Sequence, residues 1–331
     1  MKKFTISLDY YNICQLKDLL KLIEGDKYPY IEWHFVVDML PSAKEISEIY
    51  RILDEFSKQH DIVFKKYIAC RLQNYSRTSL KAVKKHRFYL EVLIKDVLFD
   101  IELLKRISKT LIKNKQSHKY IADVSADKQM TVYNVFAEVG LPLNFKHINY
   151  TDEMISLFPK WLQDKKAIPL NIFDYILRLI LLRDNMHNCC YSSCLGKNVY
   201  FRQNGDISFC TLFPVETVIG NVNNLTCFNE IYHNEKFIDV LQGATEQRNN
   251  CIATCGNYAY CQGGCPLNSN MCTNQNYIKL VELAQKELIN VLQSNDLSKY
   301  NSCVKSAVYD SLAFNSTFNI KNRKENRDEK I

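Results

Sequence analysis

The chain has 331 residues, of which 47% are hydrophobic and 24% are charged, and its formal net charge is +7. A chain of this length can bury a sizeable core, and the length indicates two domains. Its apolar runs are too short for a signal peptide or a transmembrane helix, so we expect a cytoplasmic protein without a membrane partner. The basic residues are spread along the chain as on solvated helix faces, so no nucleic-acid partner is expected.

Strand-like and helix-like segments alternate through the first half of the chain. The predicted strands are residues 4–8, 31–37, 61–69, 88–94, 119–124 and 145–150. Helical patterns lie between them, and Ser42 with Glu45 predicts a capping box at the start of the second helix. This alternation predicts an α/β fold with a parallel sheet and helices outside it, either an open doubly wound sheet or a partial barrel.

Few residues with obvious chemistry lie near the ends of these strands, where ligands bind in both architectures. The chain has only nine glycines, and no glycine-rich phosphate loop follows any predicted strand. Cys14 and Cys70 are single cysteines, which usually behave as small apolar residues. No catalytic residue is therefore predicted in this half.

Cysteines dominate the second half, where ten of the chain's thirteen fall between residues 187 and 272. Residues 199–201 and 207–209 alternate around Asn204 and Gly205, which predicts a β-hairpin with a two-residue turn. Cys194 precedes this hairpin and Cys210 ends it. The hairpin can therefore bring cysteines that are distant in sequence to one metal centre.

Five further cysteines are closely spaced. They are Cys251, Cys255, Cys261, Cys265 and Cys272. Thiolates at this density repel one another unless a cation neutralises them, and a reducing compartment disfavours disulfides. Zinc and iron–sulfur clusters both stay open, with spacings of three and five residues favouring a four-iron cluster over paired zinc knuckles. Cys227 and Cys303 lie outside the tight spacing and are expected to be spare.

The second half resembles the seven-cysteine SPASM domain, an extension of radical S-adenosylmethionine (SAM) enzymes that modify peptides and proteins. The resemblance is carried by the cysteine spacing from Cys194 to Cys272, by Gly205, and by the runs NGDISFC, IGNV and CQGGCP. The family usually has two residues between its first close pair, whereas three lie between Cys251 and Cys255.

The resemblance implies two 4Fe-4S clusters. One would be held by Cys194, Cys210, Cys265 and an upstream cysteine, for which Cys190 and Cys189 compete. The other would be held by Cys251, Cys255, Cys261 and Cys272.

The first half departs from the radical SAM pattern. Those enzymes hold their catalytic cluster through CxxxCxxC after the first strand, where this chain has DYYNICQ at residues 9–15. The Gly-Gly-Glu-Pro run expected after the second strand is replaced by DMLP at residues 38–41. One thiolate cannot hold that cluster, so SAM is not an expected cofactor of this chain alone. Two explanations stay open, a fragment that lacks the enzyme's beginning and a barrel whose active site has decayed.

The resemblance implies three parts: a degenerate radical-SAM-like (βα)6 partial barrel at residues 1–183, a SPASM domain at 184–275, and a C-terminal helix with a charged tail at 276–331. The expected function is that of a cluster-binding accessory that works with an intact radical SAM enzyme on a substrate peptide. The alternatives are a fragment of a radical SAM peptide-modifying enzyme, an electron-transfer or oxidoreductase protein in its own right, and a structural zinc protein.

Overall fold

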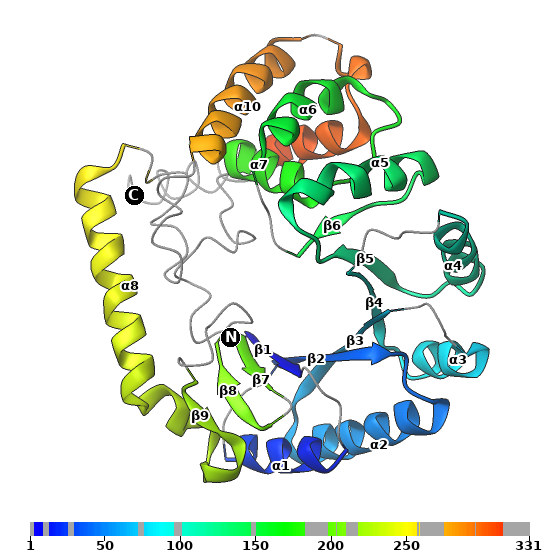
Figure 1. Cartoon of the computed structure of the whole chain (residues 1–331), viewed down its shortest axis with the longest axis vertical. Coiled ribbons are helices and arrows are strands. Elements are labelled where there is room, and N and C mark those ends of the chain that lie inside the picture. The colour runs from blue at the N-terminus through cyan, green and yellow to red at the C-terminus, as the bar shows by residue number, and fades with distance from the viewer. Residues whose placement is uncertain are drawn as a thin grey trace, which may run out of the picture. The chain divides into compact units, whose positions relative to one another are not determined.

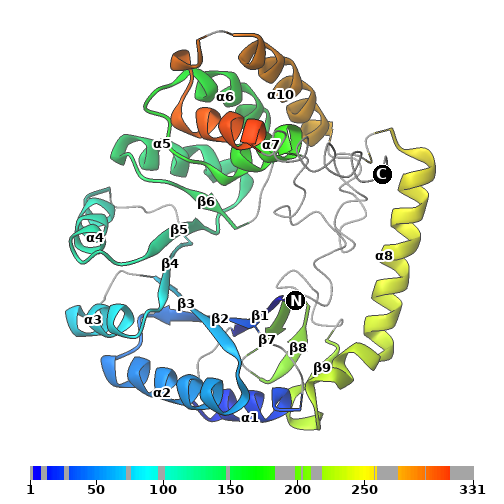
Figure 2. The same cartoon turned by 180° about the vertical axis from the view of Figure 1, so that it is seen from behind.

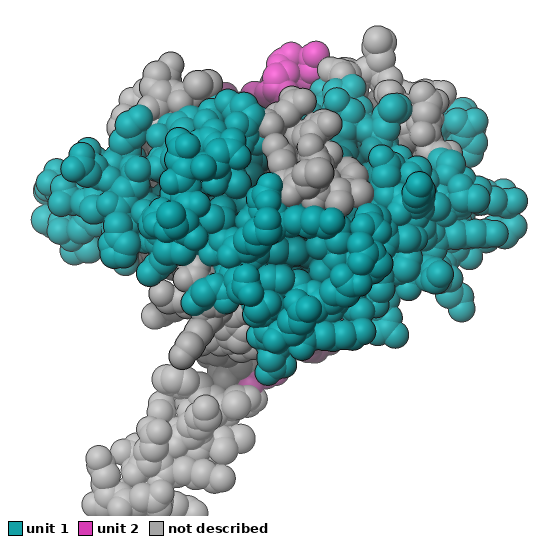
Figure 3. Space-filling view, turned by 90° about the horizontal axis from the view of Figure 1, so that it is seen from below, with its two compact units in different colours: residues 1–121, 190–269 teal, residues 122–189, 270–331 magenta. Residues whose placement is uncertain are grey.

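The computed structural model of the chain divides into two compact units, coloured separately in Figure 3. Unit 1 comprises Met1–Ile121 and Cys190–Ser269, and unit 2 comprises Ala122–Cys189 and Asn270–Ile331. The structure describes residues 3–8, 13–25, 30–71, 76–95, 101–146, 150–182, 198–202, 204–209, 218–256, 258, 275–294 and 296–313. Within these ranges, no helix combines the length and the apolar character needed to cross a bilayer.

Unit 1 is built on a parallel sheet. Its parallel strands are β1 (Lys3–Leu8), β2 (Tyr30–Met39), β3 (Val63–Arg71), β4 (Tyr89–Ile94) and β7 (Asn198–Phe201). Strands β1 to β4 pair in sequence order, and β7 pairs with the other side of β1. Strand β5 (His118–Ala122) follows β4 in the strand order. The first five predicted strands are thus confirmed, with ends shifted by one or two residues.

Four helices connect these strands. They are α1 (Ile13–Ile23), α2 (Ala43–His60), α3 (Arg77–Lys85) and α4 (Ile101–Lys113). Both cartoon views show α1, α2 and α3 on the same side of the strands (Figure 1, Figure 2). The rings of Trp33 and Phe64 lie 5.9 Å apart, and Phe64 lies 6.2 Å from Phe56 of α2. This face of the sheet is therefore the apolar one.

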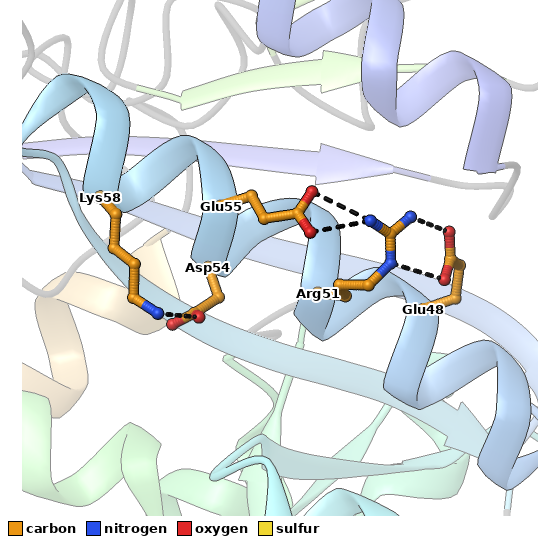
Figure 4. Close-up of polar contacts among 5 residues, drawn as sticks. All are labelled: Glu48, Arg51, Asp54, Glu55 and Lys58. Atoms are coloured by element: carbon orange, nitrogen blue, oxygen red, sulfur yellow. Dashed lines mark hydrogen bonds and ion pairs between the residues drawn. The ribbon is translucent and has the colours of Figure 1, made fainter.

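Helix α2 shows how local sequence fixes an element. The backbone N–H of Ser42 donates to Glu45 Oε2 at 2.7 Å, and the N–H of Glu45 donates to Ser42 Oγ at 3.3 Å, which confirms the predicted capping box. On its solvent face Arg51 donates to the carboxylates of Glu48 and Glu55, three and four residues away (Figure 4). Such pairs add a few tenths of a kcal/mol each, about 0.2–0.5, so packing of the opposite face stabilises the helix.

The second segment of unit 1 begins with the predicted hairpin, formed by β7 and β8 (Asp206–Ser208), which is confirmed. The hairpin is followed by β9 (Gly220–Asn221), the 3₁₀ turns η4 (Val222–Asn224) and η5 (Phe228–His233), and helix α8 (Glu235–Thr254). Strands β7 and β8 are antiparallel, with Phe201 opposite Ile207. The N–H of Arg202 donates to Asp206 O at 2.8 Å, so the turn is longer than the two residues expected.

Unit 2 is mainly helical. Its elements are η1 (Ala126–Lys128), α5 (Gln129–Val139), β6 (Asn144–Phe145), α6 (Asp152–Gln163), α7 (Asn171–Leu182), α10 (Gln275–Gln293), η7 (Leu297–Lys299) and a helix at residues 302–313. Its core contains the rings of Phe158, Trp161 and Phe173, and the Trp161 indole N–H donates to Ile168 O at 2.9 Å.

The sixth strand, predicted over residues 145–150, is β6 with only two residues. The Asn171 side chain accepts from the Phe145 N–H and donates to the Phe145 carbonyl, both at 2.9 Å. An amide side chain thus takes the place of a neighbouring strand. Residues 147–149 lie outside the described residues.

Candidate functional site

The predicted cluster ligands fall into two groups. Cys251 and Cys255 lie within the described part of the chain, at the end of α8. The other predicted ligands, which lie outside the described residues, are Cys190, its competitor Cys189, Cys194, Cys210, Cys261, Cys265 and Cys272. Among the described residues no three His, Cys, Asp or Glu side chains are grouped so that they could hold a metal ion.

The end of α8 explains the unusual spacing of its two cysteines. Cys251 lies in the last turn, and Cys255 caps the helix by donating its N–H to Cys251 O at 2.9 Å. Residues four apart lie on one side of a helix, so a three-residue spacing brings both partly exposed side chains to the same side. Two cysteine sulfurs on one side of a helix end are donors of the type that iron–sulfur clusters use.

The chain reverses direction just after Cys255. The N–H of Tyr258 donates to Cys255 O at 3.1 Å. The Arg248 Nε donates to the Tyr258 hydroxyl at 2.8 Å, ten residues away in sequence. The Tyr258 side chain therefore reaches back to α8. Its partner Arg248 is three residues before Cys251 in that helix.

The runs NGDISFC and IGNV form one connected framework. The Asn221 Nδ2 donates to Asn204 O at 3.1 Å and to Asp206 Oδ1 at 3.0 Å, which joins β9 to the hairpin turn. The Val222 N–H donates to Gly205 O at 2.9 Å. Gly205 has a φ of +84°, and a Cβ there would lie 3.1 Å from the Asn221 side chain. These residues fix the β-structure immediately before Cys210.

A second group of polar residues occupies the sheet face opposite α1–α3. We call Glu32, His34, Lys65, Tyr67, Glu91 and Lys119 the inner-face cluster. Lys119 Nζ lies 2.7 Å from Glu91 Oε1, and Lys65 Nζ lies 3.6 Å from Glu32 Oε1. Both carboxylates are buried, with 6% and 5% of their surface exposed for Glu32 and Glu91. Buried carboxylates require such partners.

The cluster changes the protonation of its members. Burial is the largest influence on His34 and favours its neutral form, but contacts with the Glu32 and Glu91 carboxylates outweigh burial and raise the pKa of His34 above 6.5. For Glu91 burial is again the largest influence, but His34 and Lys119 lower its pKa below 4.5. The contact between His34 and Glu91 therefore favours the charged form of both groups.

Sequence reasoning missed the inner-face cluster. A signal was present in β2, where Ile31, Trp33 and Phe35 alternate with polar residues that include Glu32 and His34. In a strand of a parallel sheet, alternation of this kind indicates that one face does not pack against apolar helices.

The sequence lacks the radical SAM motifs after the first and second strands, and the structure describes part of both segments. Helix α1 begins at Ile13, so Cys14 belongs to its first turn, while residues 9–12 lie outside the described residues. After the second strand, Asp38 and Met39 end β2 and are exposed, whereas Leu40 is buried before the Ser42 cap.

Three further cysteines are described. Burial raises the pKa of the Cys70 thiol to about 12, in agreement with its predicted apolar role. Cys303 is partly exposed, and burial together with Asp174 raises its pKa. Cys227 precedes η5 and is also partly exposed.

No protein-family model and no curated protein sequence matches the chain. Among solved structures, native anSMEcpe with bound AdoMet is similar, with a TM-score of 0.65 and 15% identity over 88% of this chain and 99% of that chain. Native anSMEcpe with bound AdoMet and Kp18Cys peptide is similar with a TM-score of 0.61 and 16% identity over 87% of this chain and 98% of that chain. The chain therefore shares the mixed α/β fold of these proteins, and its five-strand parallel sheet confirms the predicted α/β class.

Proposed function

We propose that this chain is a 4Fe-4S cluster-binding SPASM-domain protein that assists a separate radical SAM enzyme in modifying a peptide. One observation carries the proposal. The fold is that of a protein that has been captured with AdoMet and peptide, yet the sequence contains no CxxxCxxC, and residues 9–12 between β1 and α1 include no cysteine. The chain thus combines a peptide-modifying scaffold with the loss of the catalytic cluster.

Two clusters are proposed, with the ligands that the SPASM resemblance implies. Cys251, Cys255, Cys261 and Cys272 would hold one cluster. Cys194, Cys210, Cys265 and Cys190, or Cys189 in its place, would hold the other. The described residues support this in two ways, through the common side of α8 shared by Cys251 and Cys255 and through the rigid framework before Cys210. When bound, such clusters supply electron transfer or hold the fold.

The end of α8 also favours a bound cation. The last carbonyl groups of a helix carry partial negative charge, which disfavours anions nearby. Two thiolates at residues 251 and 255 would lie at this end of α8. A cationic cluster iron removes that repulsion, and Arg248 adds positive charge one turn earlier.

The proposed division of labour follows from the same parts. Residues 1–183 would form the degenerate barrel that receives the substrate peptide, residues 184–275 the SPASM domain, and residues 276–331 a C-terminal helix and tail. The partner radical SAM enzyme would cleave SAM, because this chain lacks the ligands for that reaction.

The test is metal analysis of anaerobically reconstituted protein. We expect brown protein with about eight iron and eight sulfide per chain, as two four-iron clusters require. Cys251→Ser and Cys255→Ser should each lose about half of the iron, the content of one such cluster. The matched control Cys227→Ser should keep all of it.

Two results would contradict the proposal. Colourless protein that contains only zinc would remove the iron–sulfur clusters. Production of 5′-deoxyadenosine from SAM by this polypeptide alone would show that it is a SAM-cleaving enzyme and not an accessory.

A further inference from the structure

Arg71 lies at the edge of the sheet where ligands bind, and no acidic side chain among the described residues pairs with it. It is the last residue of β3 and pairs with Met39, the last residue of β2. Its side chain is partly buried, and its buried Nε has no hydrogen-bond partner among the described residues. No ion pair to Arg71 is formed within the described ranges either. A buried donor without an acceptor costs about 1–3 kcal/mol, and a ligand that accepts a hydrogen bond from Arg71 would recover that cost.

The charged side chains of the inner-face cluster are already paired with one another. Strand alternation places Lys65, Tyr67, Ala69 and Arg71 on one face of β3, so Arg71 extends the inner-face cluster toward the C-terminal edge. Within the cluster, each of the two buried carboxylates has its own lysine, and His34 lies between them. The cluster therefore offers no carboxylate to Arg71.

The residues next to Arg71 on this face of the sheet are known from the strand register. Ala69 carries only a methyl group, and the register of β3 and β4 places it opposite Glu91. In parallel α/β sheets, ligands bind at the carboxyl ends of the strands. Arginine binds carboxylates through two parallel N–H···O bonds, which gives it both charge and geometric selectivity.

We infer that Arg71 binds a carboxylate of the substrate peptide, from an acidic side chain or from the peptide's C-terminus. This inference rests on the proposed peptide-binding function and adds the chemical class of the substrate. The binding energy would come from a guanidinium that has no acidic partner in the described part of the chain, so peptides without a carboxylate should bind more weakly.

The experiment compares two pools of short, mixed-sequence synthetic peptides by equilibrium dialysis against the full, reconstituted chain. One pool contains a central glutamate and a free C-terminus, and the other contains glutamine and a C-terminal amide. We expect the wild-type chain to bind the acidic pool at least about tenfold more tightly, the ratio that roughly 1.4 kcal/mol provides. Arg71→Gln should abolish this preference, and Arg71→Lys should keep part of it, because lysine supplies charge without the paired N–H groups.

Arg106→Gln is the matched control, because it removes the same charge from an exposed position on α4. It should leave the preference unchanged. Peptides released from each pool and sequenced by mass spectrometry would then show whether a side-chain or a terminal carboxylate is selected. Thermal unfolding of each variant confirms that it is folded.

The outcomes separate this inference from the function on which it rests. Equal binding of both pools, or an undiminished preference in Arg71→Gln, would overturn the role of Arg71 and leave peptide binding intact. If Arg71 instead pairs with one of the chain's own carboxylates, Arg71→Gln should keep the preference for the acidic pool and unfold at a lower temperature than the wild-type chain. Failure of both pools to bind would overturn peptide binding and the inference together.

Discussion

The imidazole ring of His34 lies flat against the phenol ring of Tyr67 on the next strand, with centroids 4.1 Å apart and planes 8° from parallel. Its Nδ1 lies 3.5 Å from Glu91 Oε2, and its Nε2 lies 3.7 Å from Glu32 Oε2. A neutral imidazole has only one N–H, whereas the imidazolium has two. The imidazolium is therefore the form that suits both carboxylates. Stacking on Tyr67 of β3 keeps the His34 ring between Glu32 of β2 and Glu91 of β4.

Two histidines should titrate on opposite sides of the ordinary histidine value of 6.5. The carboxylates raise the pKa of His34, whereas burial and the nearby Lys85 and Lys66 lower the pKa of His86. Heteronuclear NMR of the histidine rings over a pH series measures both values. His34→Gln should remove the higher resonance and His86→Gln the lower one. A His34 pKa below 6.5 would contradict the imidazolium assignment.

The stability of unit 1 should depend on pH through the inner-face cluster. Because the folded pKa of His34 is raised, its contribution is complete below the unfolded value near 6.5 and is lost as pH rises through the folded pKa. Because the folded pKa of Glu91 is lowered, its contribution is present above about 4.5 and is lost as pH falls through the folded pKa.

Denaturant unfolding of His34→Gln and Glu91→Gln across pH measures these contributions. The deficit of His34→Gln relative to wild type should shrink as the solution becomes alkaline, and that of Glu91→Gln should shrink as it becomes acidic. At neutral pH we expect Glu91→Gln to cost roughly 1–3 kcal/mol, since Lys119 is partly exposed. Deficits that stay constant over the whole pH range would argue against the charge pairing.

Local sequence patterns predicted those elements whose signals lie within the element itself. The capping box at Ser42 and the apolar periodicity of α2 depend on neighbours within one element, and both are confirmed. Strand β6 was overestimated because the pairing of Phe145 with the Asn171 side chain is a tertiary contact that no local pattern contains. Tertiary contacts override local preference in this way.

Helix α8 was missed for a different reason. Of its 20 residues only Phe237 and Ala244 are buried, so it lacks the apolar stripe by which a helix is usually found in sequence. Its start carries one signal, Asn234, whose side chain accepts from the Lys236 N–H. The cysteine spacing at its other end drew attention to metal chemistry, although that spacing is also one helical turn. The remaining predicted ligands stay predictions.

Cys70 should resist thiol reagents in the folded protein. Its side chain is fully buried in β3, and burial raises its pKa to about 12, so almost no thiolate exists at pH 8. Iodoacetamide followed by peptide mass spectrometry should find Cys70 modified only after denaturation. Cys227, which is partly exposed, serves as the internal control and should react in the folded apoprotein. Rapid labelling of Cys70 under native conditions would show that this part of the sheet opens.

Gly205 should be irreplaceable in the hairpin turn. Its φ of +84° is costly for residues with a Cβ, by about 1–2 kcal/mol, and the added atom would lie 3.1 Å from the Asn221 side chain that joins β9 to the turn. Gly205→Ala should therefore lower the free energy of unfolding by at least that amount. Gly243→Ala is the matched control, because Gly243 lies in α8 with nothing within 4 Å of an added Cβ, and it should stabilise the chain by about 0.5–1 kcal/mol. Urea unfolding of the two variants measures both changes, and a neutral Gly205→Ala would mean that the turn relaxes without loss of the Asn221 contacts.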